Sequence, residues 1–304
     1  MSKQATTYSE QLDVLVSRGL VVENRDFAEH CLAHHNYYRL SAYRFSFIEN
    51  GNPDRFAPGT KFEQLWNLYR FDRGLRQLLL EATKRIEISV RSRLAYEIGH
   101  RLGPLAYLEN IHFRDPLIHA RTLVKLDGEM SRSKEKFIGH HRDILHMKWP
   151  PIWVVVEVAS FGTISNLLNH IEPPQIRQAI ADSYKMDEKT FCSLFHHLSV
   201  LRNTAAHHSR LWNRKFVVTF QLPKKKPADL WPNFNQQKLN GNGKDRHIYN
   251  TLVLLVHFIR CIDPQSCWTS RLLKHLSTLE HVFIQEMGFP NNWLELPIWA
   301  EIHE

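Results

Sequence analysis

An all-α fold is the structure that this 304-residue sequence predicts, and three observations lead to it. Apolar residues recur at helical spacing over most of the chain, helix-capping residues precede the periodic stretches, and strand character is confined to one segment, 215–222. The length allows one large domain or two modest ones with a real core. We expect an N-terminal helical region over 1–50, a helical core over 51–265, and a helix with an irregular tail over 266–304.

The helices of the N-terminal third are delimited by caps and breaks. A helix that begins near Ser9 ends at Gly19, and Asn24 caps the next one. Prolines and glycines over 49–60 predict a loop, after which 60–101 keeps helical spacing long enough for one long core helix. Its apolar positions are Phe62, Leu65, Trp66, Tyr69, Leu75, Leu79, Ala82, Ile86, Val90 and Leu94, and its other face carries Asp72, Arg73, Arg76, Lys84, Arg85, Glu87, Arg91 and Arg93.

The segment 34–47 is rich in aromatic residues and arginine. Its tyrosines are candidates to stack on bases beside Arg39 and Arg44. The alternative, that Tyr38, Tyr43 and Phe47 belong to the core, is the preferred interpretation.

Further helices follow in the middle of the chain. Asp115-Pro116 is an N-cap followed by proline at the first helical position. Pro150-Pro151 marks the next boundary, and Glu157 lies in the apolar run that follows, where an acid needs a partner. Another helix is expected over 174–184, and Asp187 caps the one after it.

The C-terminal third begins with the strand-like segment 215–222 and a proline-bounded basic loop. Residues 240–243 (NGNG) form a clear break, and the helix after Lys244 is apolar enough to be largely buried. A last helix is expected over 266–286, before an irregular aromatic tail.

Composition and motifs exclude several classes of protein. No apolar run is long enough to cross a membrane and the N-terminus lacks the apolar core of a signal peptide, so we expect a soluble, cytoplasmic protein that does not bind membranes. The four cysteines are scattered along the sequence, so we expect them to be reduced and to serve as packing residues. Histidine pairs such as 207/208 point about 100° apart on a helix and rarely chelate one ion, so neither a metal site nor a cofactor is expected. Phosphate-binding glycine loops and a nucleophile elbow are also missing from the sequence.

The positive charge of the chain is concentrated in one region. The formal net charge is +8, yet residues 190–228 contain no acidic residue and carry seven basic ones. These are Arg202, Arg210, Arg214, Lys215, Lys224, Lys225 and Lys226. A concentrated positive field attracts polyanions, of which nucleic acid is the commonest in a cytosol, although many basic surfaces are merely solvated.

The helix capped by Asp187 brings an arginine to the margin of an apolar face. That face consists of Phe191, Leu194, Phe195, Leu198, Leu201 and Ala205. A guanidinium there needs a carboxylate, a neighbouring chain or an anionic ligand, so Arg202 is a candidate functional residue. His207 lies about 140° around an ideal helix from Arg202. The two residues therefore share a target only if the helix bends or ends between them, or if a second chain completes the site.

Arg202, Asn203 and His207 supply what phosphodiester cleavage requires. They are a cation for the developing phosphate charge, a polar group that orients it, and an imidazole that titrates near neutral pH.

The string LRNTAAHHSRLWNR at 201–214 resembles the hallmark of the Abi-like abortive-infection family, whose members belong to the HEPN superfamily of helical ribonucleases. Further blocks resemble the same family in order: RGL at 18–20, NYYRLSAY at 36–43, FDRGLRQLLLEATKRIEISVRSRL at 71–94 and PPIWVVVEVASFGTIS at 150–165. The resemblance covers 9–214. Ala205 departs from it, since relatives often carry cysteine there, but this position lies on the packing face.

The resemblance implies a HEPN-like four-helix bundle core, with additional N-terminal and C-terminal helices, that dimerises so that two Arg-x4-His motifs face each other. It also implies metal-independent RNA cleavage by the ribose 2′-hydroxyl. His207 would then be the general acid or base, with His208 as the alternative, while Arg202 stabilises the phosphorane and Asn203 positions the phosphate or holds Arg202.

Other residues take supporting roles on the same interpretation. Arg210 and Arg214 would bind flanking phosphates, and Trp212 is expected to be a packing anchor. The remaining RNA-binding candidates are Lys215, Lys224, Lys225 and Lys226. The candidates to surround and orient the Arg202 side chain are Glu87, Arg91 and Glu157.

Two functional hypotheses follow. The first is an RNA endonuclease of phage defence, inactive until an unidentified phage-derived trigger appears. The second is a non-catalytic module that binds a structured noncoding RNA. A nuclease requires His207 for turnover, whereas a binding module requires the basic residues and tolerates its loss.

Overall fold

The computed structural model describes residues 4–223, 226–238 and 246–300. The helices are α1 (Tyr8–Ser17), α2 (Arg25–His35), α3 (Tyr37–Ser41), α4 (Phe62–Arg101), α5 (Pro116–Arg132), α6 (Lys136–Gly139), α7 (Ile152–Val158), α8 (Phe161–His170), α9 (Pro174–Asp182), α10 (Glu188–Ala206), α11 (Tyr249–Ile262), α12 (Trp268–Leu276), α13 (His281–Glu286) and α14 (Pro297–Ala300). The strands are β1 (Ile48–Glu49) and β2 (Asn52–Phe56). This architecture confirms the all-α prediction.

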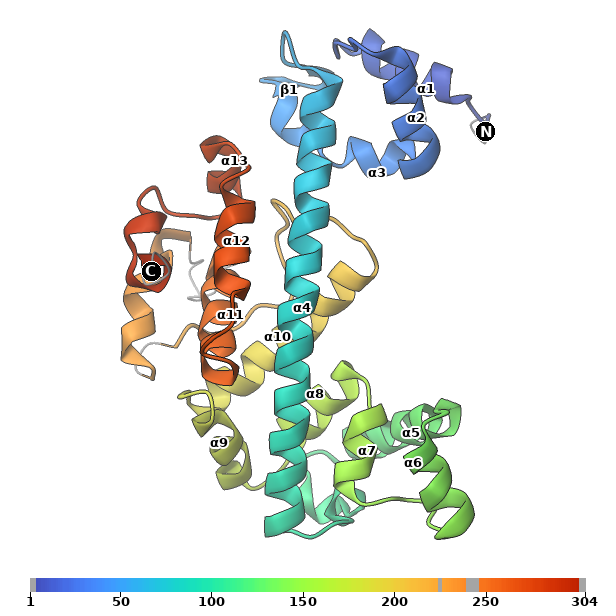
Figure 1. The fold of residues 1–304 in the computed structure, drawn as a ribbon, viewed down its shortest axis with the longest axis vertical. Coiled ribbons are helices and arrows are strands. Elements are labelled where there is room, and N and C mark those ends of the chain that lie inside the picture. Colours follow the sequence, from blue (N-terminus) through green and yellow to red (C-terminus); the bar gives the residue numbers. More distant parts are fainter. Residues whose placement is uncertain (1–3, 224–225, 239–245, 301–304) are drawn as a thin grey trace.

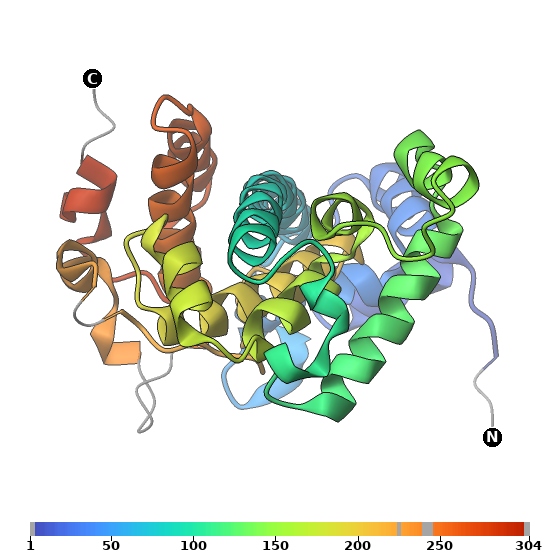
Figure 2. The same ribbon diagram turned by 90° about the horizontal axis from the view of Figure 1, so that it is seen from below.

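The 40-residue helix α4 is the axis of the molecule (Figure 1). Its stripe of Leu75, Leu79, Ile86, Val90 and Leu94 is completely buried, and each such side chain contributes about 1.5–3 kcal/mol by leaving water. Viewed end-on, α4 lies between α11 and α12 on one side and α5 and α7 on the other (Figure 2). The long core helix predicted over 60–101 is confirmed.

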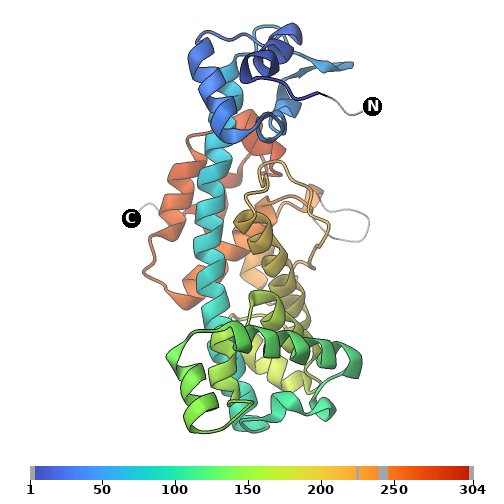
Figure 3. The ribbon, with the colours of Figure 1, turned by 90° about the vertical axis from the view of Figure 1, so that its right-hand side faces the viewer.

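The N-terminal helices and the hairpin gather at one end of α4 (Figure 3). A capping box at Thr7 starts α1, two residues before the expected start near Ser9. The Asn24 side chain accepts the Phe27 N–H at the start of α2, as predicted. Strands β1 and β2 pair antiparallel within the segment predicted as a loop. The prediction missed them because they are so short that their hydrophobic pattern is undetectable. The turn uses Gly51 at φ +85°, a conformation that glycine adopts without strain.

The other end of α4 carries α5 to α9 (Figure 3). The Asp115 side chain accepts the N–H groups of Leu117 and Ile118 and so caps α5. Helix α10 then packs against α4, α8 and α9, which places its C-terminus beside the middle of the axis. Among the described residues, no helix combines the length and apolarity that crossing a membrane requires.

Two predictions for the C-terminal third are wrong. Residues 215–222 do not form a strand. The Phe216 N–H donates to the Arg246 carbonyl and the Val218 carbonyl accepts from His197, so these two backbone groups are used outside a ladder. The helix predicted over 266–286 is interrupted between α12 and α13. There the hydroxyls of Ser277 and Thr278 donate to helix-end carbonyls and compete with helix continuation.

The buried helix after the break follows the prediction, whereas the tail expected to be irregular contains the short helix α14. Helix α11 is almost wholly buried, and the aromatic tail packs Trp293 and Trp299 into the core. The break at 240–243 lies outside the described residues.

Candidate functional site

Helix α10 presents Arg202 near its C-terminal end. The Asp187 side chain accepts the Thr190 N–H and starts the helix, and the whole predicted apolar face is buried. Because Arg202 stands at the margin of this face, its side chain is 29% exposed, so one side contacts protein and the other is open to a ligand.

Three groups orient the Arg202 guanidinium. Glu87 on α4 lies 3.5 Å from Nη2, and Asn203 accepts a hydrogen bond from Nη1 at 3.1 Å. The ring of Phe161 lies 5.7 Å from the guanidinium carbon, within range of a cation–π contact. Asn203 therefore contacts Arg202, which is one of the two roles expected for it.

Glu87 is shared between two arginines. Its other oxygen accepts from Arg91 at 2.5 Å, and Arg91 also donates to the carbonyls of Glu157 and Ala159 at 3.1 and 2.5 Å. The Glu157 carboxylate is exposed, so only its backbone takes part, and the expectation that this acid needs a partner is wrong. Because the guanidiniums of Arg91 and Arg202 both face the single carboxylate of Glu87, the cluster has a net positive charge.

The end of α10 separates Arg202 from both histidines. His207 is the C-cap, His208 adopts φ +57°, and the N–H groups of His208 and Ser209 return to the carbonyls of Ala205 and Thr204. This is a Schellman motif, in which glycine normally occupies the left-handed position that His208 holds here. Both histidines are exposed. Helix α10 therefore ends between Arg202 and His207, which is one of the conditions under which the two residues could share a target.

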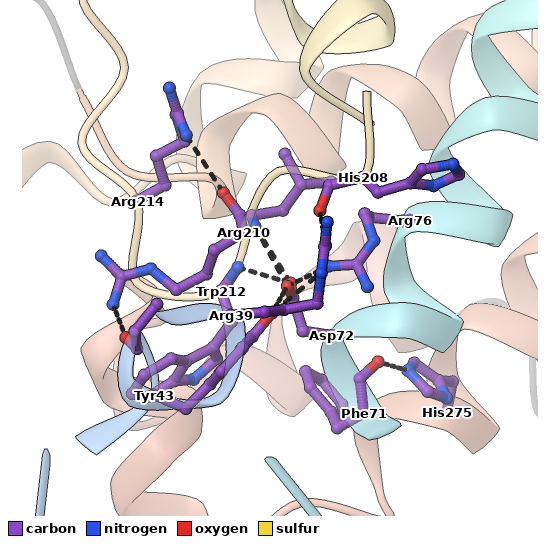
Figure 4. A network of polar contacts seen from close by, with 12 residues as sticks. Arg39, Tyr43, Phe71, Asp72, Arg76, His208, Arg210, Trp212, Arg214 and His275 are labelled. Carbon is purple, nitrogen blue, oxygen red and sulfur yellow. Dashed lines mark hydrogen bonds and ion pairs between the residues drawn. The ribbon is translucent and has the colours of Figure 1, made fainter. Parts of the chain in front are cut away.

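A buried carboxylate fixes the chain after the histidines (Figure 4). Asp72 is fully buried on α4 and accepts the N–H groups of Leu211 and Trp212 at 3.1 and 2.7 Å. It also accepts the Tyr43 hydroxyl at 2.6 Å and forms an ion pair with Arg76. Burial raises the pKa of the Asp72 carboxyl, and Arg76 opposes that shift.

Asp72, Arg76 and Glu87 were placed on the face of α4 opposite its apolar stripe, yet the structure buries all three. Asp72 binds the 211–212 backbone and pairs with Arg76 on the same helix. Glu87 contacts Arg202, the arginine that it was a candidate to support. Asp72 precedes Leu75 by three residues and Leu79 by seven, which is the spacing of the buried face, so the sequence contained this signal.

The segment 36–43 holds the same turn from another side. The Arg39 guanidinium donates to the His208 carbonyl at 2.7 Å, and the Arg210 guanidinium donates to the Ala42 carbonyl at 2.6 Å. Burial lowers the pKa of Arg210. Arg210, expected to bind a flanking phosphate, therefore makes an internal contact that positions the loop.

Trp212 and Asn213, which follow directly in the sequence, anchor the turn to α13. The Trp212 indole N–H donates to the Phe283 carbonyl at 3.2 Å, and Asn213 donates to the Glu286 carboxylate at 2.7 Å. Trp212 is completely buried, which confirms it as a packing anchor.

The other basic candidates do not gather at one point. Arg214 and Lys215 are exposed after the turn, whereas Lys226 forms an exposed ion pair with Asp182 at 2.7 Å. Lys224 and Lys225 lie outside the described residues.

The arrangement offers a cation held in place and imidazoles open to solvent. In the described part of the chain, no hydrogen bond or ion pair joins Arg202 to either histidine, so a ligand or a second chain would have to bridge them. Over the same residues, no three His, Cys, Asp or Glu side chains are grouped to hold a metal ion. Such a set can contact phosphate and transfer a proton.

Comparison with known proteins bears on the same residues. The sequence model of a family described as Abi-like protein matches residues 30–213, which is more than half of the chain. The match includes Arg202, both histidines and the turn up to Asn213, and it begins after the RGL block at 18–20. No curated protein and no solved structure matches the chain.

Proposed function

Because the chain belongs to the family of Abi-like proteins, we propose that it acts in abortive infection as a metal-independent endoribonuclease of the HEPN type. The observation that carries this proposal is the Arg202 guanidinium, held by Glu87 and Asn203 with one side exposed, one turn before the exposed histidines. The supporting facts are a guanidinium held in a fixed position and two exposed imidazoles, all within residues 202–208.

The proposed reaction is an internal transesterification of RNA. The ribose 2′-oxygen forms a bond to the adjacent phosphorus as His207 accepts the 2′-hydroxyl proton, and the bond to the 5′-oxygen breaks as that oxygen takes a proton from an acid. The products are a 2′,3′-cyclic phosphate and a 5′-hydroxyl end. Arg202 stabilises the charge that develops on the phosphorane oxygens.

A homodimer would supply both the acid and the base. One imidazole cannot accept and donate a proton in the same concerted step, so two motifs facing each other provide the pair. The absence of a contact between Arg202 and the histidines in the described chain supports such a composite site. RNA is then the substrate, and the exposed Arg214 and Lys215 are proposed to contact flanking phosphates.

The test compares cleavage of labelled single-stranded and hairpin RNA in EDTA, with and without extract of phage-infected cells. Arg202→Ala and His207→Ala are expected to lower the cleavage rate at least about 100-fold while circular dichroism stays unchanged. His196→Ala is the matched control, because His196 is an exposed histidine on the same helix. If all three variants bind RNA like the wild type and none of the four proteins cuts it, the non-catalytic binding module replaces the nuclease.

A mixing experiment tests the composite site. Wild type is co-refolded with an equal amount of His207→Ala, so that about half of the dimers are mixed. If each site needs an imidazole from both protomers, only the wild-type dimers cut RNA, and the activity falls to about a quarter of that of the same amount of wild type. A fall to only about a half, in dimers shown to be mixed, would contradict the shared site and show that each chain has its own.

A further inference from the structure

A large groove opens at the N-terminal end of the molecule, between α1, the end of α2 and α3, the blue helices in Figure 1. Its volume is about 1110 Å³. Small-molecule pockets usually measure roughly 300–1,000 Å³, so this groove is large enough for an extended ligand.

The groove is basic. Arg18, Arg39 and Arg44 line it together with His34 and His35. Its lining, which falls entirely within the described residues, includes no Asp or Glu. Charge complementarity therefore favours an anionic occupant.

The groove is also the main site of exposed aromatic rings. The described chain has six exposed aromatic side chains, and three of them, Tyr8, Tyr38 and Phe45, line this one groove. Tyr38 is 76% exposed, the most of the six, so its preferred placement in the core is wrong, whereas Tyr43 and Phe47 are buried as expected. Exposed rings next to arginines provide what unpaired bases need for stacking, with cations for the phosphates between them.

Two residues connect the groove to the turn at the end of α10. Arg39 lines the groove and donates to the His208 carbonyl at 2.7 Å. Ala42 also lines it, and its carbonyl accepts from Arg210, whose guanidinium lies 5.8 Å from the Phe45 ring centre. The groove thus borders the turn that carries His207 and His208.

We propose that this groove binds a single-stranded segment of the RNA substrate, with bases stacked on Tyr38 and Phe45 and phosphates paired with Arg44. This inference rests on the proposed function and deepens it, since it assigns substrate selection to the α1–α3 region. Double-stranded RNA keeps its bases stacked on one another, so the groove selects unpaired RNA.

Binding of a fluorescent oligouridine, measured by anisotropy over a salt series, tests the inference. Tyr38→Ala is expected to weaken binding about ten-fold and Tyr38→Phe to retain it, because the phenyl ring stacks as well. Arg44→Ala is expected to reduce the salt slope by about one unit. The matched controls are Tyr96→Ala and Arg55→Ala, which alter an exposed tyrosine and an exposed arginine outside the groove. Binding by Tyr38→Ala equal to that of the wild type, or equal losses in the controls, would overturn the proposal.

Cleavage kinetics separate this inference from the nuclease proposal. On single-stranded RNAs of increasing length, Tyr38→Ala is expected to raise KM for the longer RNAs and to leave kcat unchanged. If the wild type binds oligouridine through Tyr38 but never cuts RNA, the groove proposal is supported and the nuclease proposal is rejected. If the wild type cuts RNA and the groove variants have the same KM as the wild type, the nuclease proposal is supported and the groove proposal is rejected.

Discussion

The carboxylate of Asp72 accepts the backbone N–H of Trp212 at 2.7 Å, although 140 residues separate the two. The same carboxylate binds the Leu211 N–H and the Tyr43 hydroxyl. A buried acid in the middle of α4 therefore fixes the path of the chain immediately after the candidate catalytic histidines. Arg202 is fixed from the same helix through Glu87, so α4 positions both halves of the candidate site.

Replacing Asp72 by alanine is expected to destabilise the fold by about 3–5 kcal/mol, because it leaves the buried Arg76 unpaired and two buried N–H groups without an acceptor. Urea unfolding of wild type and variant measures this free energy. Asp72→Asn keeps an acceptor oxygen and should lose less. A loss below about 1 kcal/mol for Asp72→Ala would show that the turn does not depend on this carboxylate.

His208→Gly is expected to stabilise the protein by about 0.5–1 kcal/mol, because His208 holds a left-handed conformation that glycine adopts freely. His207→Gly is the matched control and should destabilise, since His207 has an ordinary φ of −83°. The same pair assigns the catalytic imidazole. If His207 is the base, His208→Gly still cuts RNA; abolished cleavage in a folded His208→Gly protein would transfer the role to His208.

Glu87→Gln is expected to strengthen RNA binding and to slow cleavage. Removing the negative charge raises the local positive potential, whereas losing the ion pair lets the Arg202 guanidinium leave its position. Single-turnover kinetics and anisotropy measure the two effects separately. Opposite signs would not arise from general destabilisation, and a variant that loses both binding and cleavage would refute the positioning role.

Stability is expected to fall as the pH drops below about 6.5. Burial lowers the pKa of His257 and of His275, whose Nε2–H groups donate to the carbonyls of Tyr184 and Phe71. Between the lowered pKa of the folded state and the ordinary value of 6.5, the unfolded chain binds more protons. Each histidine therefore removes up to about 1.4 kcal/mol of stability per pH unit in that window.

Urea unfolding at several pH values between 5 and 8 measures this dependence. His257→Asn should flatten the curve, whereas His196→Ala, which removes an exposed histidine, should leave it unchanged. A wild-type curve that is flat below pH 6.5 would contradict the prediction.

Local signals in the sequence were sufficient to predict the elements that depend on them. The periodicity of α4, the caps at Asn24, Asp115 and Asp187, and the buried face of α10 all act within a few residues, and the structure confirms them. The resemblance on 201–214 also led to the family that the comparison finds.

Features that depend on distant partners were not predictable in the same way. The spacing of Asp72 to Leu75 and Leu79 fits the buried face, but its partners at 211–212 come from another part of the chain and could not be identified. Arg39 was not connected to His208 for the same reason. The strand-like segment 215–222 needed a pairing strand, and none pairs with it among the residues that the structure describes. In each case a long-range contact outweighed the local pattern.

The chemistry of the RNA ends produced in EDTA tests the central claim most directly. We predict that the wild type, with infected-cell extract where it is needed, leaves 2′,3′-cyclic phosphate and 5′-hydroxyl ends, and that Arg202→Ala leaves none while remaining folded. Cleavage that stops in EDTA, or that yields 5′-phosphate ends, or that continues unchanged in Arg202→Ala, would contradict the account.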